Sequence, residues 1–149
     1  MTKVLHELSV TRYIAAPPAK VYEVWTTHLT EFFCPPPWTV THAELDLRPG
    51  GKFLTVMRGP DGTETRNEGV FLEVVPGERL VSTDAFTLGW NPQGPFIVAI
   101  TTFEPEGIGA RYTALARHWS AESMARHEAM GFTQGWGTVA DQLAAFAEA

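Results

Sequence analysis

The stretch LDLRPGGKFLTVMRGPDGTETRNEG, residues 45–69, decides the fold class of this chain. It contains three strand-like runs separated by two turn sequences, Arg48-Pro49-Gly50-Gly51 and Gly59-Pro60-Asp61-Gly62. Proline fixes φ ahead of a turn, and glycine supplies a positive φ where other residues are strained. Asp-Gly between strand-like runs is a strong hairpin signal. The middle of the chain is therefore predicted to be an antiparallel meander, and no catalytic motif interrupts it.

Strand patterns continue on both sides of this meander, and about seven strands are expected in all. They cover residues 4–14, 38–47, 52–58, 65–75, 79–87, 96–104 and 109–118. Alternation along a strand predicts which side chains face inward. The predicted inward faces are Val70, Leu72 and Val74; Phe53, Thr55 and Met57; Ile97, Ala99, Thr101 and Phe103; and Tyr112, Ala114, Ala116 and His118.

Two other segments carry apolar residues at helical spacing. Pro17-Pro18 precedes a short amphipathic helix with Val21, Val24 and Trp25 on one face, and a second short turn is expected over residues 30–33. Ser120 is the predicted N-cap of one long C-terminal helix. The apolar stripe of this helix is Phe132, Trp136, Val139, Leu143 and Phe146. Its glycines indicate close approach to the sheet, a local bend or room for something else; they are Gly131, Gly135 and Gly137.

The order of these elements, β-α-α-β6-α, is that of the α+β helix-grip fold, a curved antiparallel sheet around a long C-terminal helix. The chain is predicted to be a single helix-grip domain over residues 1–149. Short motifs occur along it in this order: RYIAAP at 12–17, VYEVW at 21–25, DLRPGG at 46–51, GPDG at 59–62, GVF at 69–71, PGERLV at 76–81 and GFTQGW at 131–136. In order and spacing they resemble bacterial single-domain proteins of the Hsp90-ATPase-activator-homologue type, within the START/polyketide-cyclase (SRPBCC) superfamily.

This resemblance implies a cavity between the sheet and the C-terminal helix, which in related families holds apolar or amphipathic small molecules. Ala99, Ala114 and Ala116 opposite a glycine-bearing helix would leave volume, which either a cavity or close helix packing would use. A few polar groups would then fix the orientation of the ligand. The candidate ligand-binding residues are Trp38, Met57, Trp90, Phe96, Tyr112, His118, His127 and Met130.

Two other functions stay open beside ligand binding. The family name suggests an interaction protein that modulates a chaperone or a regulator. A cyclase or hydrolase would use a cavity His or Tyr as general acid–base. No catalytic residue is assigned, because His127-Glu128 begins like the zinc-protease motif H-E-x-x-H but has Gly131 in place of the second His. No metal site and no cofactor are expected, and Cys34 is interpreted as a small hydrophobic residue rather than an activated nucleophile.

Composition excludes several classes of partner and location. The 149 residues suit one domain, and a net charge of −6 with no basic cluster argues against nucleic acid. One cysteine cannot form an intramolecular disulfide, which is typical of a reducing cytoplasm. The N-terminus MTKVLHELSV has no signal-peptide core, and no run approaches the roughly 20 apolar residues that span a bilayer. A soluble cytoplasmic protein is expected, without membrane insertion, and a homodimer through edge strands stays open.

Overall fold

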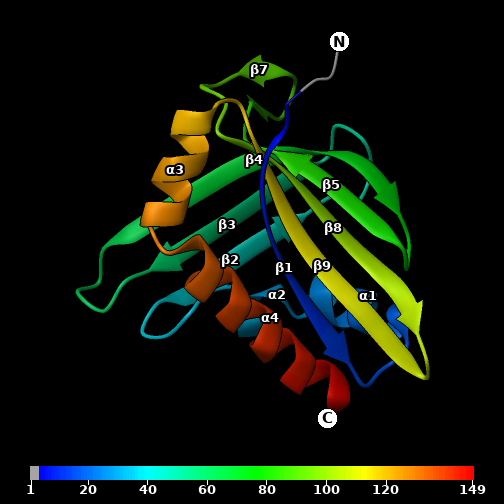
Figure 1. The fold of residues 1–149 in the computed structure, drawn as a ribbon. Helices are drawn as coiled ribbons and strands as arrows, with labels where there is room; N and C mark the ends of the chain where they lie inside the picture. Colours follow the sequence, from blue (N-terminus) through cyan, green and yellow to red (C-terminus); the bar gives the residue numbers. More distant parts are fainter. Residues whose placement is uncertain (1–3) are drawn as a thin grey trace.

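The chain forms a curved antiparallel sheet with helices against its concave face (Figure 1). The structure is a computed structural model, and it describes residues 4–149. Seven strands form the main sheet in the order β1-β9-β8-β5-β4-β3-β2. They are β1 (His6–Ile14), β2 (Thr39–Leu45), β3 (Lys52–Arg58), β4 (Glu64–Val75), β5 (Arg79–Thr83), β8 (Ile97–Glu106) and β9 (Gly109–His118). The helices are α1 (Pro18–Thr27), α2 (Leu29–Phe32), α3 (Ala121–Ala129) and α4 (Phe132–Glu148).

The first strand of the chain pairs with the last. β1 runs antiparallel to β9, from His6 opposite His118 to Ile14 opposite Ala110. β9 also pairs with β8, so β9 lies between β1 and β8 in the sheet. This closure places α4 next to β1, where Arg12 Nε donates to Asp141 Oδ1 at 2.9 Å. Arg12 therefore pairs with a carboxylate at the rim of the sheet.

The core lies between the concave face and the helices, as the helix-grip fold requires. The inward residues of β9 are all buried, from Tyr112 to His118, and Leu143 of α4 is 0% exposed. Trp136 and Val139 are half-buried against this core, while Phe132 is buried in it. Phe146 is the exception in the predicted stripe, because 43% of its surface is exposed.

The predicted C-terminal helix is present, but it is not one continuous helix from Ser120: α3 and α4 are separate. Ser120 caps α3 as expected, since its hydroxyl accepts from Ser123 N at 3.1 Å. The helix then ends at Ala129, and Gly131 adopts a left-handed φ of 96° before α4 begins. The glycines of this segment indicated close approach to the sheet, a local bend or free volume. At Gly131 the bend is what the structure shows.

Two strand predictions also need correction. Leu72 was expected to face inward, but a register irregularity between Phe71 and Glu73 interrupts the alternation, and Leu72 is 37% exposed. The strand expected over 79–87 ends at Thr83, because Asp84 Oδ1 instead accepts from the backbone N–H groups of Phe96 and Ile97. The remaining residues form a separate hairpin of β6 (Phe86–Thr87) and β7 (Asn91–Pro92).

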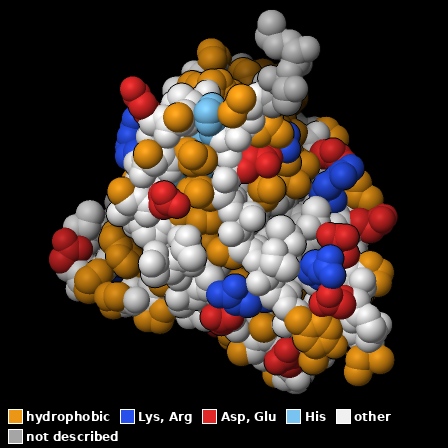
Figure 2. Space-filling view, viewed as in Figure 1, with side chains coloured by type: hydrophobic (Ala, Val, Ile, Leu, Met, Phe, Trp, Pro, Cys, Tyr) orange, Lys and Arg blue, Asp and Glu red, His pale blue; other side chains and the backbone are white. Residues whose placement is uncertain are grey.

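No helix of the described chain is both long and apolar enough to cross a membrane. The predicted lack of a leader rests partly on residues 1–3, which lie outside the described residues. On the face seen in Figure 2, acidic and basic side chains are interspersed, and no extended basic patch is visible.

Candidate ligand-binding site

Three of the predicted ligand-binding residues meet where β9 leads into α3. Phe96, His118 and His127 lie together, and α4 adds Phe132 and Trp136. The ring of His127 is central, at centroid distances of 5.0 Å from Phe96, 5.0 Å from Phe132 and 5.7 Å from Trp136. These five residues are called the histidine–aromatic cluster below.

Different elements position each member of the cluster. His118 is the last residue of β9, and alternation turns it to the concave face, where it is 5% exposed. Phe96 precedes β8 and is held through its backbone N–H, which donates to Asp84 Oδ1 at 3.1 Å. His127 projects from α3, whose register is set by the Ser120 cap. The sheet therefore supplies a fixed base, and α3 brings His127 onto it.

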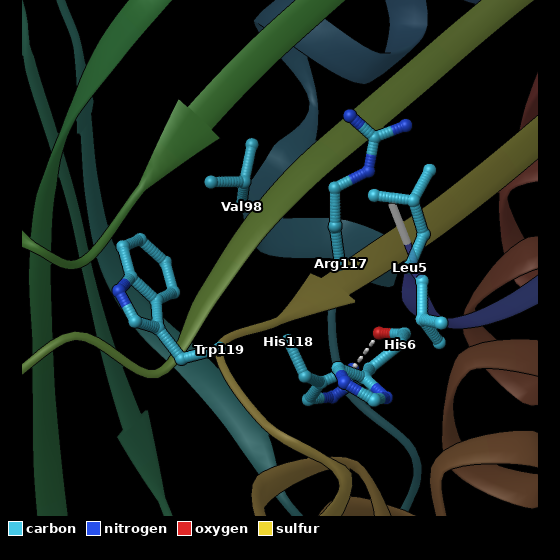
Figure 3. A pocket seen from close by; sticks show the side chains of 7 residues that line it. Leu5, His6, Val98, Arg117, His118 and Trp119 are labelled. Atoms are coloured by element: carbon cyan, nitrogen blue, oxygen red, sulfur yellow. Dashed lines mark hydrogen bonds between the residues drawn. The ribbon is translucent and has the colours of Figure 1, made fainter. Parts of the chain in front are cut away.

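The two histidines are hydrogen bonded in series. His118 Nδ1 lies 3.0 Å from the backbone oxygen of His6, a bond drawn in Figure 3. His118 Nε2 lies 2.8 Å from His127 Nδ1. The chain of bonds thus runs from β1 through β9 to α3, and it orients both rings.

The cluster favours a neutral His127. Burial lowers the pKa of His127, the nearby His118 lowers it further, and only Asp84 opposes the shift. A buried imidazolium beside a second imidazole is disfavoured for the same physical reasons. At neutral pH His127 is therefore uncharged, and its ring nitrogens can form hydrogen bonds.

Helix α3 covers this cluster lightly. None of its nine residues, all of them described, is buried. Met130, directly after it, is a predicted ligand-binding residue and is 71% exposed. The helix begins after the Ser120 cap and is followed by the left-handed Gly131, and its ring contacts with the cluster come from His127.

Tyr112 lies deeper in the interior than the cluster. It is 3% exposed, its ring centroid is 5.8 Å from that of Phe103, and burial raises its pKa to about 12. The indole N–H of Trp25 is close enough to lower that pKa slightly, yet Trp25 Nε1 is buried without a hydrogen-bond partner of good geometry among residues 4–149. Within residues 4–149, Trp25 Nε1 is therefore a buried donor without a well-oriented acceptor.

The other predicted ligand-binding residues lie apart from the cluster. Met57 is opposite Val40 in the β2–β3 ladder, and the Trp38 ring lies over Gly59, with 39% of its surface exposed. Trp90 is 56% exposed, and its ring lies against Gly50. Their roles in binding stay predictions.

Two surface pockets, of about 300 and about 260 Å³, lie beside Trp119, at the end of the sheet where β9 leads into α3. Both are lined by Val98 and Trp119, and neither includes a residue of α4. Figure 3 shows the first, with Arg117 and Leu5 on one side and Trp119 on the other. Neither pocket is therefore the predicted cavity between the sheet and α4.

Sequence reasoning missed part of the site. Phe132 and Trp136 were predicted as core residues only, and Asp84 and the His6 carbonyl carried no signal. The Ser120 cap could have placed His127 two helical turns along, but not its contact with His118. Burial raises the pKa of the Cys34 thiol, consistent with an unreactive side chain. Within residues 4–149 no group of three or more His, Cys, Asp or Glu side chains is placed to hold a metal.

A seven-strand curved antiparallel sheet against a C-terminal helix defines an α+β helix-grip protein of the START-like class. The family model described as "Activator of Hsp90 ATPase homolog 1-like protein" matches residues 15–148. The chain belongs to this family.

Solved structures agree with this assignment. A crystal structure of a Nitrosomonas europaea protein is 39% identical, with a TM-score of 0.89 over 93% of this chain and 91% of that one. A Mycobacterium smegmatis protein is 24% identical, with a TM-score of 0.80 over 97% and 95%. An AHSA1-like protein from Aeromonas hydrophila is 18% identical, with a TM-score of 0.73 over 95% and 92%, and like the previous one it shows the fold alone. No curated protein matches the chain.

Proposed function

We propose that this protein binds an apolar or amphipathic small molecule on the concave side of the sheet, beneath α3 and α4. The observation that carries the proposal is the histidine–aromatic cluster under a helix with no buried residue. Aromatic rings beside a few fixed polar groups are the usual lining of a small-molecule site. The family assignment supports a ligand-binding fold.

The loose attachment of α3 supplies an entry route. Local opening costs little free energy where few apolar contacts are lost. α3 would move about Gly131 and carry His127 away from Phe96, Phe132 and Trp136. Once a ligand has entered, α3 would close over it again and restore the bond between His118 Nε2 and His127 Nδ1.

The interior gives a reason for an amphipathic ligand. Trp25 Nε1 is a buried donor, and leaving such a group without a partner costs about 1–3 kcal/mol. A ligand acceptor that reached it, beside Tyr112, would recover that free energy. The rest of the ligand would then lie against the aromatic rings nearer the surface, beside the nitrogen atoms of His127.

An NMR titration with 2-naphthol tests the proposal. We expect shifts at the indole N–H of Trp136 and at the amides of Phe96 and α3. Trp136→Ala should weaken binding about tenfold or more, since it removes a large aromatic contact. Phe86→Ala, a half-buried aromatic on the separate hairpin, is the matched control and should bind as the wild type does. Shifts confined to Trp119 and Val98, or no shift at all, would overturn the proposal.

The family description and the exposed outer residues favour one second candidate, a protein partner of the chaperone class. Trp119 is 54% exposed and Leu5 is 46% exposed beside the pocket in Figure 3. Mixing the protein with an Hsp90-type chaperone should change its ATP turnover, and Trp119→Ala should reduce that change. Unaltered turnover would remove this candidate. A regulator as partner, and a cyclase or hydrolase role for His118 or His127, stay predictions.

A further inference from the structure

We infer that the site selects a neutral hydroxyl-bearing aromatic ligand, of the phenol class, whose O–H donates to Nε2 of His127. The inference rests on the proposed function and names the ligand chemistry of the same site. It follows from the order of donors and acceptors along the histidine chain, which begins at the carbonyl of His6.

The first bond fixes the proton of His118. A backbone carbonyl oxygen accepts and never donates, so His118 Nδ1, at 3.0 Å from His6 O, carries a hydrogen. His118 is 5% exposed, and no ion pair joins it to a carboxylate within residues 4–149. In the neutral form of His118, a hydrogen on Nδ1 leaves a lone pair on Nε2.

The second bond then fixes the proton of His127. Since His118 Nε2 accepts, His127 Nδ1 at 2.8 Å must donate. A neutral His127 with hydrogen on Nδ1 has a lone pair on Nε2. Both ring tautomers thus follow from one carbonyl group.

The free lone pair is reachable by a ligand. His127 Nε2 makes no hydrogen bond with residues 4–149. If this atom were buried, it would be a buried nitrogen without a partner, but the atom of that kind in this part of the chain is Trp25 Nε1. His127 Nε2 is therefore not fully enclosed by protein atoms, and the ring of His127 lies beside those of Phe96 and Trp136. An aromatic ring with a hydroxyl group fits both features, whereas a carboxylate brings only acceptors.

The groups facing His127 keep it an acceptor at neutral pH. They are His118 from β9 and Asp84 ahead of β6, while α4 contributes the uncharged Phe132 and Trp136. β1 contributes the His6 carbonyl through His118. Burial and His118 lower the pKa of His127, and Asp84 does not reverse this. Acid would convert Nε2 to a donor, so phenol binding should weaken as pH falls.

Imidazole nitrogen NMR on the protein without ligand tests the tautomers. We expect His118 and His127 both to carry hydrogen on Nδ1 at about pH 7.5. The exposed His28 is the control and should show the mixed tautomers of a solvated ring. Hydrogen on Nε2 of His127 would overturn the inference, whatever the protein binds.

A ligand series then tests selectivity in the wild-type protein. The probes are 2-naphthol, 2-methoxynaphthalene and 2-naphthoate, which share a ring system. 2-Naphthol should bind about five- to tenfold more tightly than the other two, the usual effect of one hydrogen bond. His127→Phe should bind 2-naphthol and 2-methoxynaphthalene equally, and His42→Phe, an exposed control on β2, should keep the preference.

The outcomes separate the two proposals. Equal binding of 2-naphthol and 2-methoxynaphthalene to the wild type contradicts the inference and leaves the proposed function standing. A preference for 2-naphthoate also contradicts it. Binding of none of the three contradicts the proposed function, and the inference with it, even if the tautomers are as stated. The wild-type series decides these cases without any variant that must fold.

Discussion

Gly50 and Gly51 join β2 to β3 in a turn that is locked onto β4. Gly50 N donates to Phe71 O at 2.7 Å, and Phe71 N donates to Gly51 O at 2.9 Å. A Cβ on Gly51 would lie 2.0 Å from the backbone oxygen of Asp46, a contact that no side-chain motion relieves. The turn motif that indicated the meander is therefore also a packing requirement.

Gly51→Ala should lower the free energy of unfolding by about 3 kcal/mol or more, because the backbone of the turn must move. Gly62→Ala is the matched control in the β3–β4 turn, where no atom lies within 4 Å of the added Cβ. It should cost about 1 kcal/mol, for its left-handed φ of 87° alone. Urea unfolding measures both, and equal losses would contradict the steric argument.

His127 should make the protein less stable in mild acid. Its pKa in the folded chain is lower than the ordinary 6.5, so the unfolded chain binds the proton more readily. The contribution of His127 to stability is therefore complete above the unfolded pKa of 6.5. It is lost as the pH falls from there through the lower pKa of the folded chain. Between about pH 7.5 and about pH 5.5, wild type should lose more stability than His127→Gln in urea unfolding. An equal loss in the two proteins would be inconsistent with a lowered pKa.

Single residues of the site were predictable only in direction. Alternation along β9 placed His118 on the concave face, where it is buried. Its partner His127 lies in a different element, and the contact depends on the angle at which α3 leaves the sheet. That angle is set by three-dimensional packing, which local sequence patterns do not encode.

At the scale of elements, α4 is the segment that the sheet grips. Leu143 is 0% exposed, whereas Phe146, on the same predicted stripe, is 43% exposed. Leu143→Ala should cost about 3 kcal/mol and Phe146→Ala about 1 kcal/mol or less, because cost follows burial. Thermal or urea unfolding compares the two. A larger loss of stability for Phe146→Ala would mean that the face of α4 carrying Phe146 is the one packed against the sheet.

Helix α3 should exchange its amide hydrogens much faster than α4. None of its residues, which are all described, is buried, whereas α4 buries Ala140 and Leu143 completely. Local opening frees such segments without global unfolding. Native-state hydrogen exchange measures the difference residue by residue. Protection of α3 equal to that of Ala140 would show that the helix is not a separate opening unit.

The predicted bounds of strands and helices were wrong where one residue changed the local backbone geometry. Lys52–Arg58 and Gly109–His118 were predicted with their observed bounds, because turn residues border them. The irregularity after Phe71 and the bend at Gly131 were not located, although glycine composition signalled a bend somewhere in the C-terminal segment. Periodicity gives the type of an element more reliably than its interruptions.

For the whole molecule, the sheet should not fold without α4. Residues 1–131 would expose Val10, Ile14 and Ala116, which α4 helps to bury. We expect this truncated chain to lack a cooperative unfolding transition by circular dichroism. Glu148→Gln in the full chain is the control, since it removes only the charge of the side chain that accepts from Ala15 N and should stay folded. A cooperatively folded fragment would contradict the claim that the sheet needs α4 to fold.

The edges of the sheet are β1 and β2, and a homodimer through them stays a prediction that light scattering would check. The class of fold followed from element order, which is a property of the whole chain. The shape of the interior did not, because it depends on how each aromatic ring packs against the others.

The pairing of β1 with β9 has a consequence for biosynthesis. The partner of Ser9 is Leu115, so the amino-terminal segment finds its hydrogen-bonding partner after roughly 100 more residues have left the ribosome. At about 5–20 residues per second, this delay lasts about 5–20 s. Throughout that interval β1 is an apolar segment whose backbone N–H and C=O groups have no strand partner. The speed of translation up to β9 therefore sets how long β1 can pair with a wrong strand.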